Sequence, residues 1–152
     1  MDSIDKKILD ELQKDAKLTN QELATKVSLS PAPCLRRVRA LEQQGIIQGY
    51  HASVDQEKCG LSINAFVLIK MVRPTESIMK AFEDHINRVE EVVECFLMTG
   101  AHDYMLHVVS PSLKEYEKFV RRELNMFESI ASIESSFAFG QVKRLTRIPI
   151  PR

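Results

Sequence analysis

Apolar residues recur along this chain with a helical period before Gly60 and with a strand-like period after it. The first periodic stretch predicts an amphipathic helix from about residue 2 to residue 15, with an apolar face formed by Ile4, Ile8, Leu9 and Leu12. A short second helix is predicted around Leu23, Ala24 and Val27. Thr19 followed by Glu22 is typical of a capping box, which satisfies two backbone donors at the start of a helix.

A third helix is predicted to begin at Ser30 and Pro31, because serine caps helices and proline fits the first helical position. Gly45 is expected to end this helix. Two short strands, residues 46–50 and 51–54, are then predicted to form a small wing around Gln48 and Gly49. Residues 1–54 therefore predict a winged helix-turn-helix domain, which can lay one helix in a DNA groove.

Residues 55–60 are polar, end in glycine and form a candidate linker. Beyond them, apolar segments with β-branched and aromatic residues predict strands over residues 61–72, 92–99, 103–109 and 130–139. Helical stripes lie between the first two strands and between the last two. This order predicts a ferredoxin-like βαββαβ domain over residues 61–140, followed by a basic tail over residues 141–152. The expected fold class is α+β.

Both faces of the first predicted strand are apolar. Ile63, Ala65, Val67, Ile69 and Met71 alternate with Phe66, Leu68 and Val72. Two helices can cover only one face of a four-stranded antiparallel sheet. We therefore expect the second face to pack on another copy of the chain, which gives a dimer.

The composition is that of an ordinary globular protein, with 44% hydrophobic residues, 28% charged residues and a formal net charge of zero. The charge is uneven, since residues 51–140 hold nine basic and fourteen acidic residues while residues 141–152 hold four basic and none acidic. A local basic surface can still bind phosphate. Cys34, Cys59 and Cys95 are widely spaced and no secretory or membrane-spanning segment is recognisable, so we expect a cytoplasmic protein.

The third predicted helix carries three arginines and no acidic residue before Glu42. On a helical projection Cys34, Val38 and Leu41 face the core with Leu35 at its edge, while Arg36, Arg39 and Gln43 lie opposite, below Ala32, and Arg37 is on the flank. Arginine pairs bidentately with guanine or phosphate, and small residues permit close approach to the groove. A solvated basic face would have the same pattern. The candidate DNA-binding residues are Thr19, Asn20, Ser30, Ala32, Pro33, Arg36, Arg37 and Arg39.

Five segments, in order along nearly the whole chain, carry a resemblance to a known family. They are residues 4–9 (IDKKIL), 18–24 (LTNQELA), 30–38 (SPAPCLRRV), 41–47 (LEQQGII) and 99–104 (TGAHDY), with Ser135, Ser136 and Phe137 near the end. The chain resembles the Lrp/AsnC family of leucine-responsive and feast/famine transcription regulators of bacteria and archaea. The resemblance implies a winged helix-turn-helix joined to a βαββαβ effector domain. It also implies double-stranded DNA and an amino-acid effector as partners, with a homo-dimer that assembles further, commonly to an octamer.

The resemblance also implies an effector site in the loop between the second and third strands of the C-terminal domain. By carry-over, Gly100 would offer backbone groups to a carboxylate and Asp103 would bind an ammonium group. Without the resemblance, residues 99–103 would be interpreted as a hairpin turn, and Ser135 and Ser136 as polar spacers on a strand. The candidate effector-binding residues are Met98, Thr99, Gly100, Ala101, His102, Asp103, Tyr104, Ser135 and Ser136. We expect the effector to be a small, mostly neutral amino acid.

No catalytic motif or phosphate loop is present, so the sequence predicts neither an enzyme nor a cofactor. The best metal candidate is Cys95, His102 and His107. If Thr99 pairs with Tyr104, Cys95 and His107 point to opposite faces, and a one-residue slip brings them together.

An alternative function remains open. The chain could be a ferredoxin-like metabolite-binding or oligomerising module whose N-terminal domain binds a protein instead of DNA. The two functions differ in their salt dependence, since DNA binding through several phosphate contacts weakens steeply with salt. The basic tail, with Lys143, Arg144, Arg147 and Arg152, could add phosphate contacts or could simply be solvated.

Overall fold

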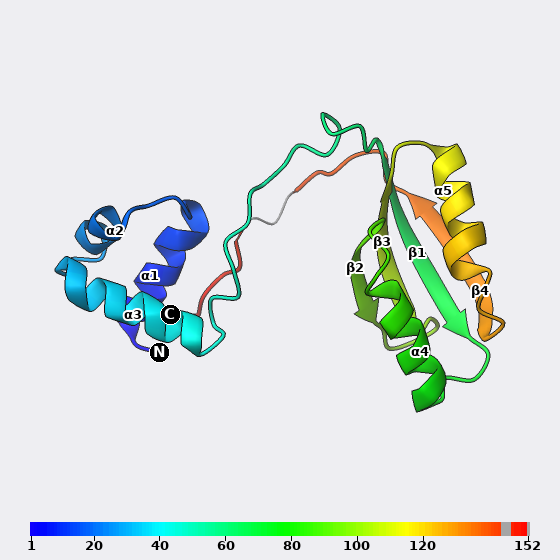
Figure 1. Ribbon diagram of the computed structural model, residues 1–152, viewed down its shortest axis with the longest axis horizontal. Helices are drawn as coiled ribbons and strands as arrows, with labels where there is room; N and C mark the ends of the chain where they lie inside the picture. Colours follow the sequence, from blue (N-terminus) through cyan, green and yellow to red (C-terminus); the bar gives the residue numbers. More distant parts are fainter. Residues whose placement is uncertain (144–146, 152) are drawn as a thin grey trace. The chain divides into compact units, whose positions relative to one another are not determined.

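A computed structural model describes residues 1–143 and 147–151 of the chain. The chain folds as two units (Figure 1), of which the first, the N-terminal unit, comprises Met1–Ser53 with the described residues of Val142–Arg152. The second, the sheet unit, comprises Val54–Gln141. Each unit has its own buried apolar cluster, so each can be described by itself.

The N-terminal unit contains the three predicted helices, α1 (Ser3–Lys14), α2 (Asn20–Lys26) and α3 (Pro31–Gln43). The capping box predicted at Thr19 and Glu22 is present, and a second one at Asp2 and Asp5 begins α1. The core of the unit is formed by Ile8, Leu23, Ala24, Val27, Cys34 and Leu41. Periodicity alone therefore predicted the helices and most of the residues that hold them together.

The turn between α2 and α3 brings the two helices close together. Ser28 takes a positive φ of 58°, a conformation that non-glycine residues rarely adopt. The side-chain amide of Asn20, at the start of α2, donates to the carbonyl of Pro31, at the start of α3, over 2.8 Å. The second helix is thus tied directly to the beginning of the third.

The predicted wing strands are absent from residues 46–54. The backbone N–H groups of Ile46 and Ile47 both donate to the carbonyl of Leu41 at the end of α3, at 3.0 and 3.2 Å. Tyr50 turns back toward the same helix and donates its hydroxyl to Glu42 over 2.9 Å. Part of this segment therefore bonds to α3 instead of forming a ladder, and an isolated two-stranded hairpin of this length is at best marginally stable.

The sheet unit has the predicted strand and helix order. It comprises β1 (Ile63–Met71), α4 (Glu76–Ile86), β2 (Val92–Leu97), β3 (Tyr104–Ser110), α5 (Leu113–Phe119) with a π-helical turn (Val120–Leu124), and β4 (Ile130–Phe137). The strands form one antiparallel sheet in the order β2-β3-β1-β4. Three strands are shorter than predicted, because apolar residues at the predicted ends lie in the connections, and β3 has the predicted length but begins one residue later.

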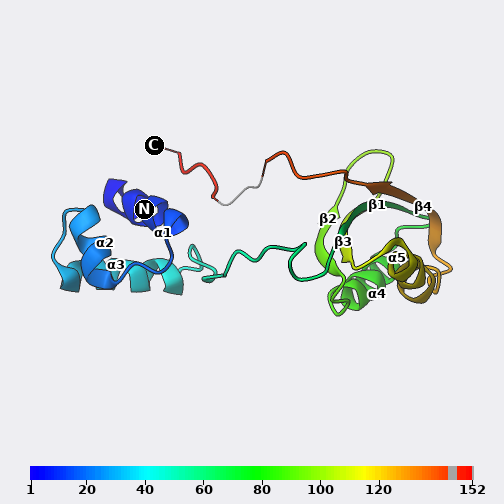
Figure 2. The same cartoon turned by 90° about the horizontal axis from the view of Figure 1, so that it is seen from above.

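The helices of the sheet unit cover only one face of the sheet (Figure 2). On that face Ala65, Val67 and Ile69 of β1 are fully buried against residues of α4 and α5. On the other face, which we call the open face, Phe66 is 36% exposed and Phe96 of β2 is 45% exposed. The alternation predicted for the first strand is thus confirmed.

Candidate DNA interface and effector site

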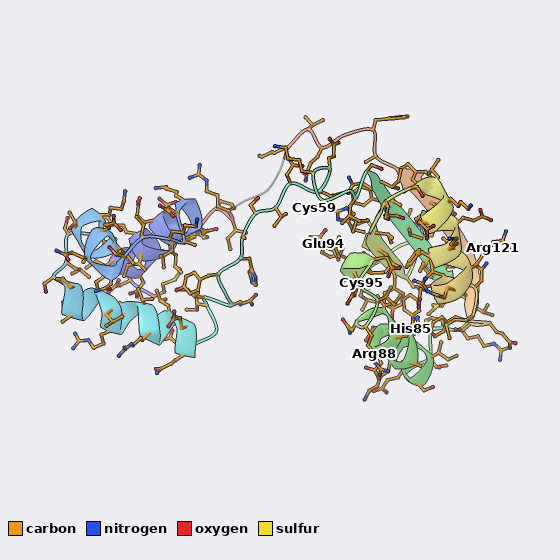
Figure 3. All side chains as sticks on the ribbon, turned by 45° about the horizontal axis from the view of Figure 1, so that its top comes forward. Cys59, His85, Arg88, Glu94, Cys95 and Arg121 are labelled. Atoms are coloured by element: carbon orange, nitrogen blue, oxygen red, sulfur yellow. The ribbon has the colours of Figure 1, made fainter. Side chains whose placement is uncertain are left out.

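The outer side of α3 presents two exposed arginines. Cys34 and Leu41 are buried in the core and Val38 packs against it, so Arg36 and Arg39 point away from the unit and are exposed. Figure 3 shows nitrogen-tipped side chains projecting from α3. Within residues 1–143 and 147–151, neither arginine has a carboxylate partner. Two free guanidinium groups on one helix suit an anionic partner.

Arg37 is placed differently from Arg36 and Arg39. Its Nη1 donates to carboxylate oxygens of Asp2 and Asp5, at 2.7 and 2.8 Å, and so joins α3 to the start of α1. The N–H of Asp5 and the Arg37 guanidinium together hold the pKa of the Asp2 carboxyl below its usual value. These ion pairs connect residues more than thirty positions apart, which is why helical projection could not find them.

The residues predicted to contact DNA at the start of α3 are only partly free. Ser30 is exposed but makes no side-chain capping bond, contrary to the expectation that it caps the helix. Ala32 is exposed and Pro33 is half-buried. The hydroxyl of Thr19 is engaged in the capping box, and the amide nitrogen of Asn20 bonds Pro31. Ser30 and Ala32 therefore lie open beside the free arginines, whereas Thr19 and Asn20 have structural contacts.

Leu35 is the most exposed large apolar residue of α3, which agrees with its predicted place at the edge of the core. Its side chain is 37% exposed and is not among the apolar residues that pack against the core of the N-terminal unit. The packed residues nearest to it on α3 are Cys34 and Val38.

The predicted effector loop, residues 98–103, is closed by backbone bonds at both ends. The N–H of Met98 donates to the carbonyl of Asp103 over 2.8 Å, and the N–H of Asp103 donates to the carbonyl of Ile69 in β1, also over 2.8 Å. Gly100 has a φ of 108°, which other residues rarely adopt. A glycine is therefore suited to this tip, and its substitution would strain the loop.

The side chain of Asp103 ties this loop to the end of β1. One oxygen accepts from the N–H of Met71 over 2.7 Å, and the other accepts from Nζ of Lys70 over 3.2 Å. The Met71 amide, followed by the Lys70 ammonium, lowers the pKa of the Asp103 carboxyl. Each oxygen can still accept a further hydrogen bond.

The other candidate effector residues lie on two different sides of the sheet. Tyr104 is 1% exposed, faces the helices and donates its hydroxyl to Glu83 of α4 over 2.8 Å. Ser135 also faces the helices, with its hydroxyl 2.5 Å from that of Tyr116. Ser136 pairs with Phe66 on the open side. Tyr104 and Ser135 are therefore separated from a ligand on the open face by the sheet itself.

His102 reaches β4 on the open side, where its Nε2 lies 3.1 Å from Glu134. Together with Lys70 and Asp103, it gives this end of the open face a polar border, whereas Ser136 lies farther along β4, opposite Phe66. Sequence reasoning missed Lys70 and Glu134. Alternation along each strand could have indicated both. Lys70 lies on the same side of β1 as Phe66, and Glu134 lies on the same side of β4 as Ser136.

The metal site considered for Cys95 and His107 does not form. In the observed register Cys95 pairs with Leu106 and Glu94 pairs with His107, so Cys95 and His107 lie on opposite faces of the sheet. Figure 3 labels Glu94 and Cys95, the successive residues of β2 whose side chains leave on these two sides. Throughout the described residues, no group of three His, Cys, Asp or Glu side chains could hold a metal ion.

His107 instead belongs to a polar row on the open face. Its Nε2 lies 2.9 Å from the amide oxygen of Asn64, and its Nδ1 lies 3.2 Å from Glu94. The ring stacks on Phe66, with centroids 4.8 Å apart and an angle of 13° between the planes. The open face is therefore apolar with a hydrogen-bonded polar row crossing it.

The end of the chain lies on α1. The N–H of Ile148 donates to Oε1 of Gln13 over 2.6 Å, and Nε2 of Gln13 donates back to the Ile148 carbonyl over 3.2 Å. Arg144 and Arg152, two of the four basic tail residues, lie outside the described residues. That the tail contacts DNA stays a prediction.

A cavity of about 680 Å³ lies between the end of α4 and α5, and it contains none of the predicted site residues. Its wall includes Arg122, which pairs with Glu91 and Glu123, and His85, whose Nε2 lies 2.9 Å from Glu123. Within the described residues, no helix is long and apolar enough to cross a membrane.

The chain matches two family models, one for each unit. Residues 1–48 match a winged helix-turn-helix DNA-binding domain, and residues 64–148 match the Lrp/AsnC ligand binding domain. The chain belongs to the Lrp/AsnC family of transcriptional regulators. The resemblance seen in the sequence is thereby confirmed, and so is the α+β fold class, although the wing itself has no strands in residues 46–54.

Members of the family are similar to this chain over nearly their whole length. The leucine-responsive regulatory protein of Escherichia coli (strain K12) is 37% identical over 150 residues, which cover 99% of this chain and 92% of that protein. An AsnC family transcriptional regulator from Agrobacterium tumefaciens is 37% identical, with a TM-score of 0.92 and coverage of 98% and 97%. A Neisseria meningitidis transcriptional regulator solved in complex with L-Met is 34% identical, with a TM-score of 0.91 and coverage of 98% and 96%.

Proposed function

We propose that this Lrp/AsnC protein regulates transcription in the cytoplasm by laying α3 in the major groove of specific DNA sites, and that it acts by binding and not by catalysis. The observation that carries the proposal is the pair of exposed arginines, Arg36 and Arg39, which have no carboxylate partner among the described residues and lie beside the small residue Ala32. An exposed start of α3 at Ser30 adds a place for a phosphate group. Arg37 braces α3 against α1 and does not read bases.

Arg36 and Arg37 provide a matched pair of variants for a test of DNA binding. Full-length protein is titrated with a duplex selected from random DNA, over a range of salt concentrations. Wild-type binding is expected to fall by orders of magnitude between about 50 and 200 mM salt. Arg36→Ala should cost about 1–3 kcal/mol and relax one base preference. Arg37→Ala should weaken all sequences alike and lower the melting temperature of the N-terminal unit.

Salt-independent binding, or selection of no sequence at all, would contradict this function. In that case the N-terminal unit would be better explained as a protein-binding module.

We also propose that two copies of the chain pair through the open face, and that dimers assemble further, up to an octamer. This is supported by the exposure of Phe66 and Phe96 on a sheet face that no helix covers. Phe66→Asp would place an unpaired charge in this interface, so the dimer dissociation constant should rise about 100-fold or more. Leu113→Asp, at an exposed position of α5, is the control. Sedimentation of a stable wild-type monomer at micromolar concentration would contradict the dimer.

We further propose that a small, mostly neutral amino acid binds at the effector loop and alters assembly or DNA binding. Backbone groups around Gly100 would bind its carboxylate, and the free acceptor capacity of Asp103 would bind its ammonium. Met98, Thr99, Ala101, His102 and Ser136 would line the site, whereas Tyr104 and Ser135 would not touch the ligand. The relatives named for leucine response and solved with L-Met support this class of ligand.

Calorimetry with each of the twenty amino acids tests the effector. Binding of one or a few small neutral ones, with a change in assembly, is expected. No heat and no change in assembly with any of them would contradict it.

A further inference from the structure

Leu35 is the most exposed large apolar residue of α3. Cys34 and Leu41 are buried in the core of the N-terminal unit, and Val38 packs against it. Leu35 is 37% exposed and is not part of that cluster. Part of its side chain is therefore open on the surface of α3 to a partner that contacts this helix.

The position of Leu35 on the helix identifies the side that this partner must touch. At about 100° per residue, Leu35 lies within about 60° of Ala32 and about 40° of Arg39. It therefore stands on the exposed flank between the small residue at the start of α3 and the basic residues of the outer side. It is the fifth residue of α3, and the N-terminal part of a recognition helix is the part that contacts base edges.

The charges around Leu35 indicate the chemistry of the partner. Arg36 and Arg39 are exposed and without carboxylate partners in the described part of the chain, while Arg37 is engaged with Asp2 and Asp5. A partner that satisfies this surface must be anionic overall and must offer a small apolar group between its anionic groups. The major groove of DNA meets both conditions, because phosphates flank it and the C5-methyl group of thymine is its one apolar base-edge group.

We propose that Leu35 reads a thymine by contact with its C5-methyl group, one base in each half-site. This inference rests on the proposed DNA binding through α3 and adds a specificity-determining residue to it. Arg36 and Arg39 supply charge and guanine or phosphate contacts. Leu35 supplies a preference for thymine, which charged side chains cannot supply. The contact would bury one methyl group, and its loss should weaken binding by about fourfold.

Replacement of thymine by deoxyuridine is a direct test, because uracil keeps every hydrogen-bonding group of thymine and lacks only the methyl. Full-length protein selects a duplex from random DNA, and each thymine of that duplex is then replaced singly. Fluorescence anisotropy measures the affinity of wild type, Leu35→Ala and Ile46→Ala for every duplex. Ile46 is the matched control, since it is 41% exposed but lies beyond the end of α3.

For wild type and Ile46→Ala, we expect one replacement in each half-site to weaken binding about fourfold and the others to have little effect. For Leu35→Ala, that same replacement should have no effect, and its affinity for the thymine duplex should match wild-type affinity for the deoxyuridine duplex. A second variant, Leu35→Gln, should shift the base selected at this position toward adenine, because glutamine pairs bidentately with that base.

The outcomes separate this inference from the proposed function. If wild type selects a DNA sequence but no single deoxyuridine weakens binding, or if Leu35→Ala keeps the full thymine preference, Leu35 does not read a methyl group. If wild type selects no sequence and binds independently of salt, DNA binding itself is wrong. If an acidic protein binds the wild type and loses affinity for Leu35→Ala, this surface binds a protein partner and the inference is overturned.

Discussion

The two faces of the sheet come from the same strands and differ in what covers them. On the helix-covered face Ala65, Val67, Ile69 and Leu106 have no exposed surface. On the open face the aromatic residues Phe66 and Phe96 keep more than a third of their surface exposed, and a polar row at His107 crosses between them. Stability of the unit is therefore concentrated on the covered face, and the open face is the one on which the proposed dimer would form.

Removal of one large side chain from each face should give the largest difference between them. Phe82 of α4 is fully buried on the covered face and contacts the rings of Tyr104 and Phe127. Phe82→Ala should lower the free energy of unfolding by about 3–5 kcal/mol. Phe96→Ala, on the open face, should cost less than about 1 kcal/mol at concentrations where the protein is monomeric.

Urea denaturation monitored by circular dichroism measures both values. Similar losses for the two variants would mean that the open face also contributes to the stability of the single chain.

Sequence reasoning predicted the two faces because alternation along a strand is a local property. The apolar residues of both parities in β1 indicated one face for helices and one for a partner, and the capping box at Thr19 began α2 as expected. Alternation along the strands could also have predicted the face on which two candidate effector residues lie. Tyr104 shares the parity of Leu106, and Ser135 shares that of Ile133, so both could have been assigned to the covered face.

Features that depend on distant contacts could not be predicted in this way. The ion pairs of Arg37 join the start of α1 to α3, and the register of β2 with β3 depends on how many residues the loop after Leu97 contains. The wing was predicted from local turn residues, but bonds to Leu41 at the end of α3 compete with it.

A substitution at Asp103, where the effector loop meets the end of β1, should change the free energy of unfolding by an intermediate amount. Its carboxylate accepts from the Met71 N–H and from Lys70, so Asp103→Asn should cost about 1–2 kcal/mol of unfolding free energy at pH 7. Asp84→Asn, at an exposed position of α4, is the control.

The pH dependence of this cost has a definite sign. Because the folded state lowers the pKa of Asp103, the stabilisation is complete above the carboxyl's unfolded pKa of about 3.9 and is lost as pH falls through the lower folded pKa. The difference between wild type and Asp103→Asn should therefore stay constant from pH 7 to about pH 4 and narrow as the pH falls further. A difference that stays constant or widens as pH falls would show that the carboxylate is not stabilised in its charged form.

The smallest expected effect compares two neighbouring serines of β4 that lie on opposite faces. Ser135 bonds Tyr116, which is 6% exposed, so Ser135→Ala would leave the Tyr116 hydroxyl without this partner and should cost about 1 kcal/mol of unfolding free energy. Ser136→Ala removes a hydroxyl from the open face and should change the stability of the single chain by less than about 0.5 kcal/mol. Effector binding should respond in the opposite way, weakening for Ser136→Ala and staying unchanged for Ser135→Ala. Thermal denaturation and calorimetry on the same two variants measure both quantities, and a loss of effector affinity in Ser135→Ala alone would place the ligand on the covered side of the sheet.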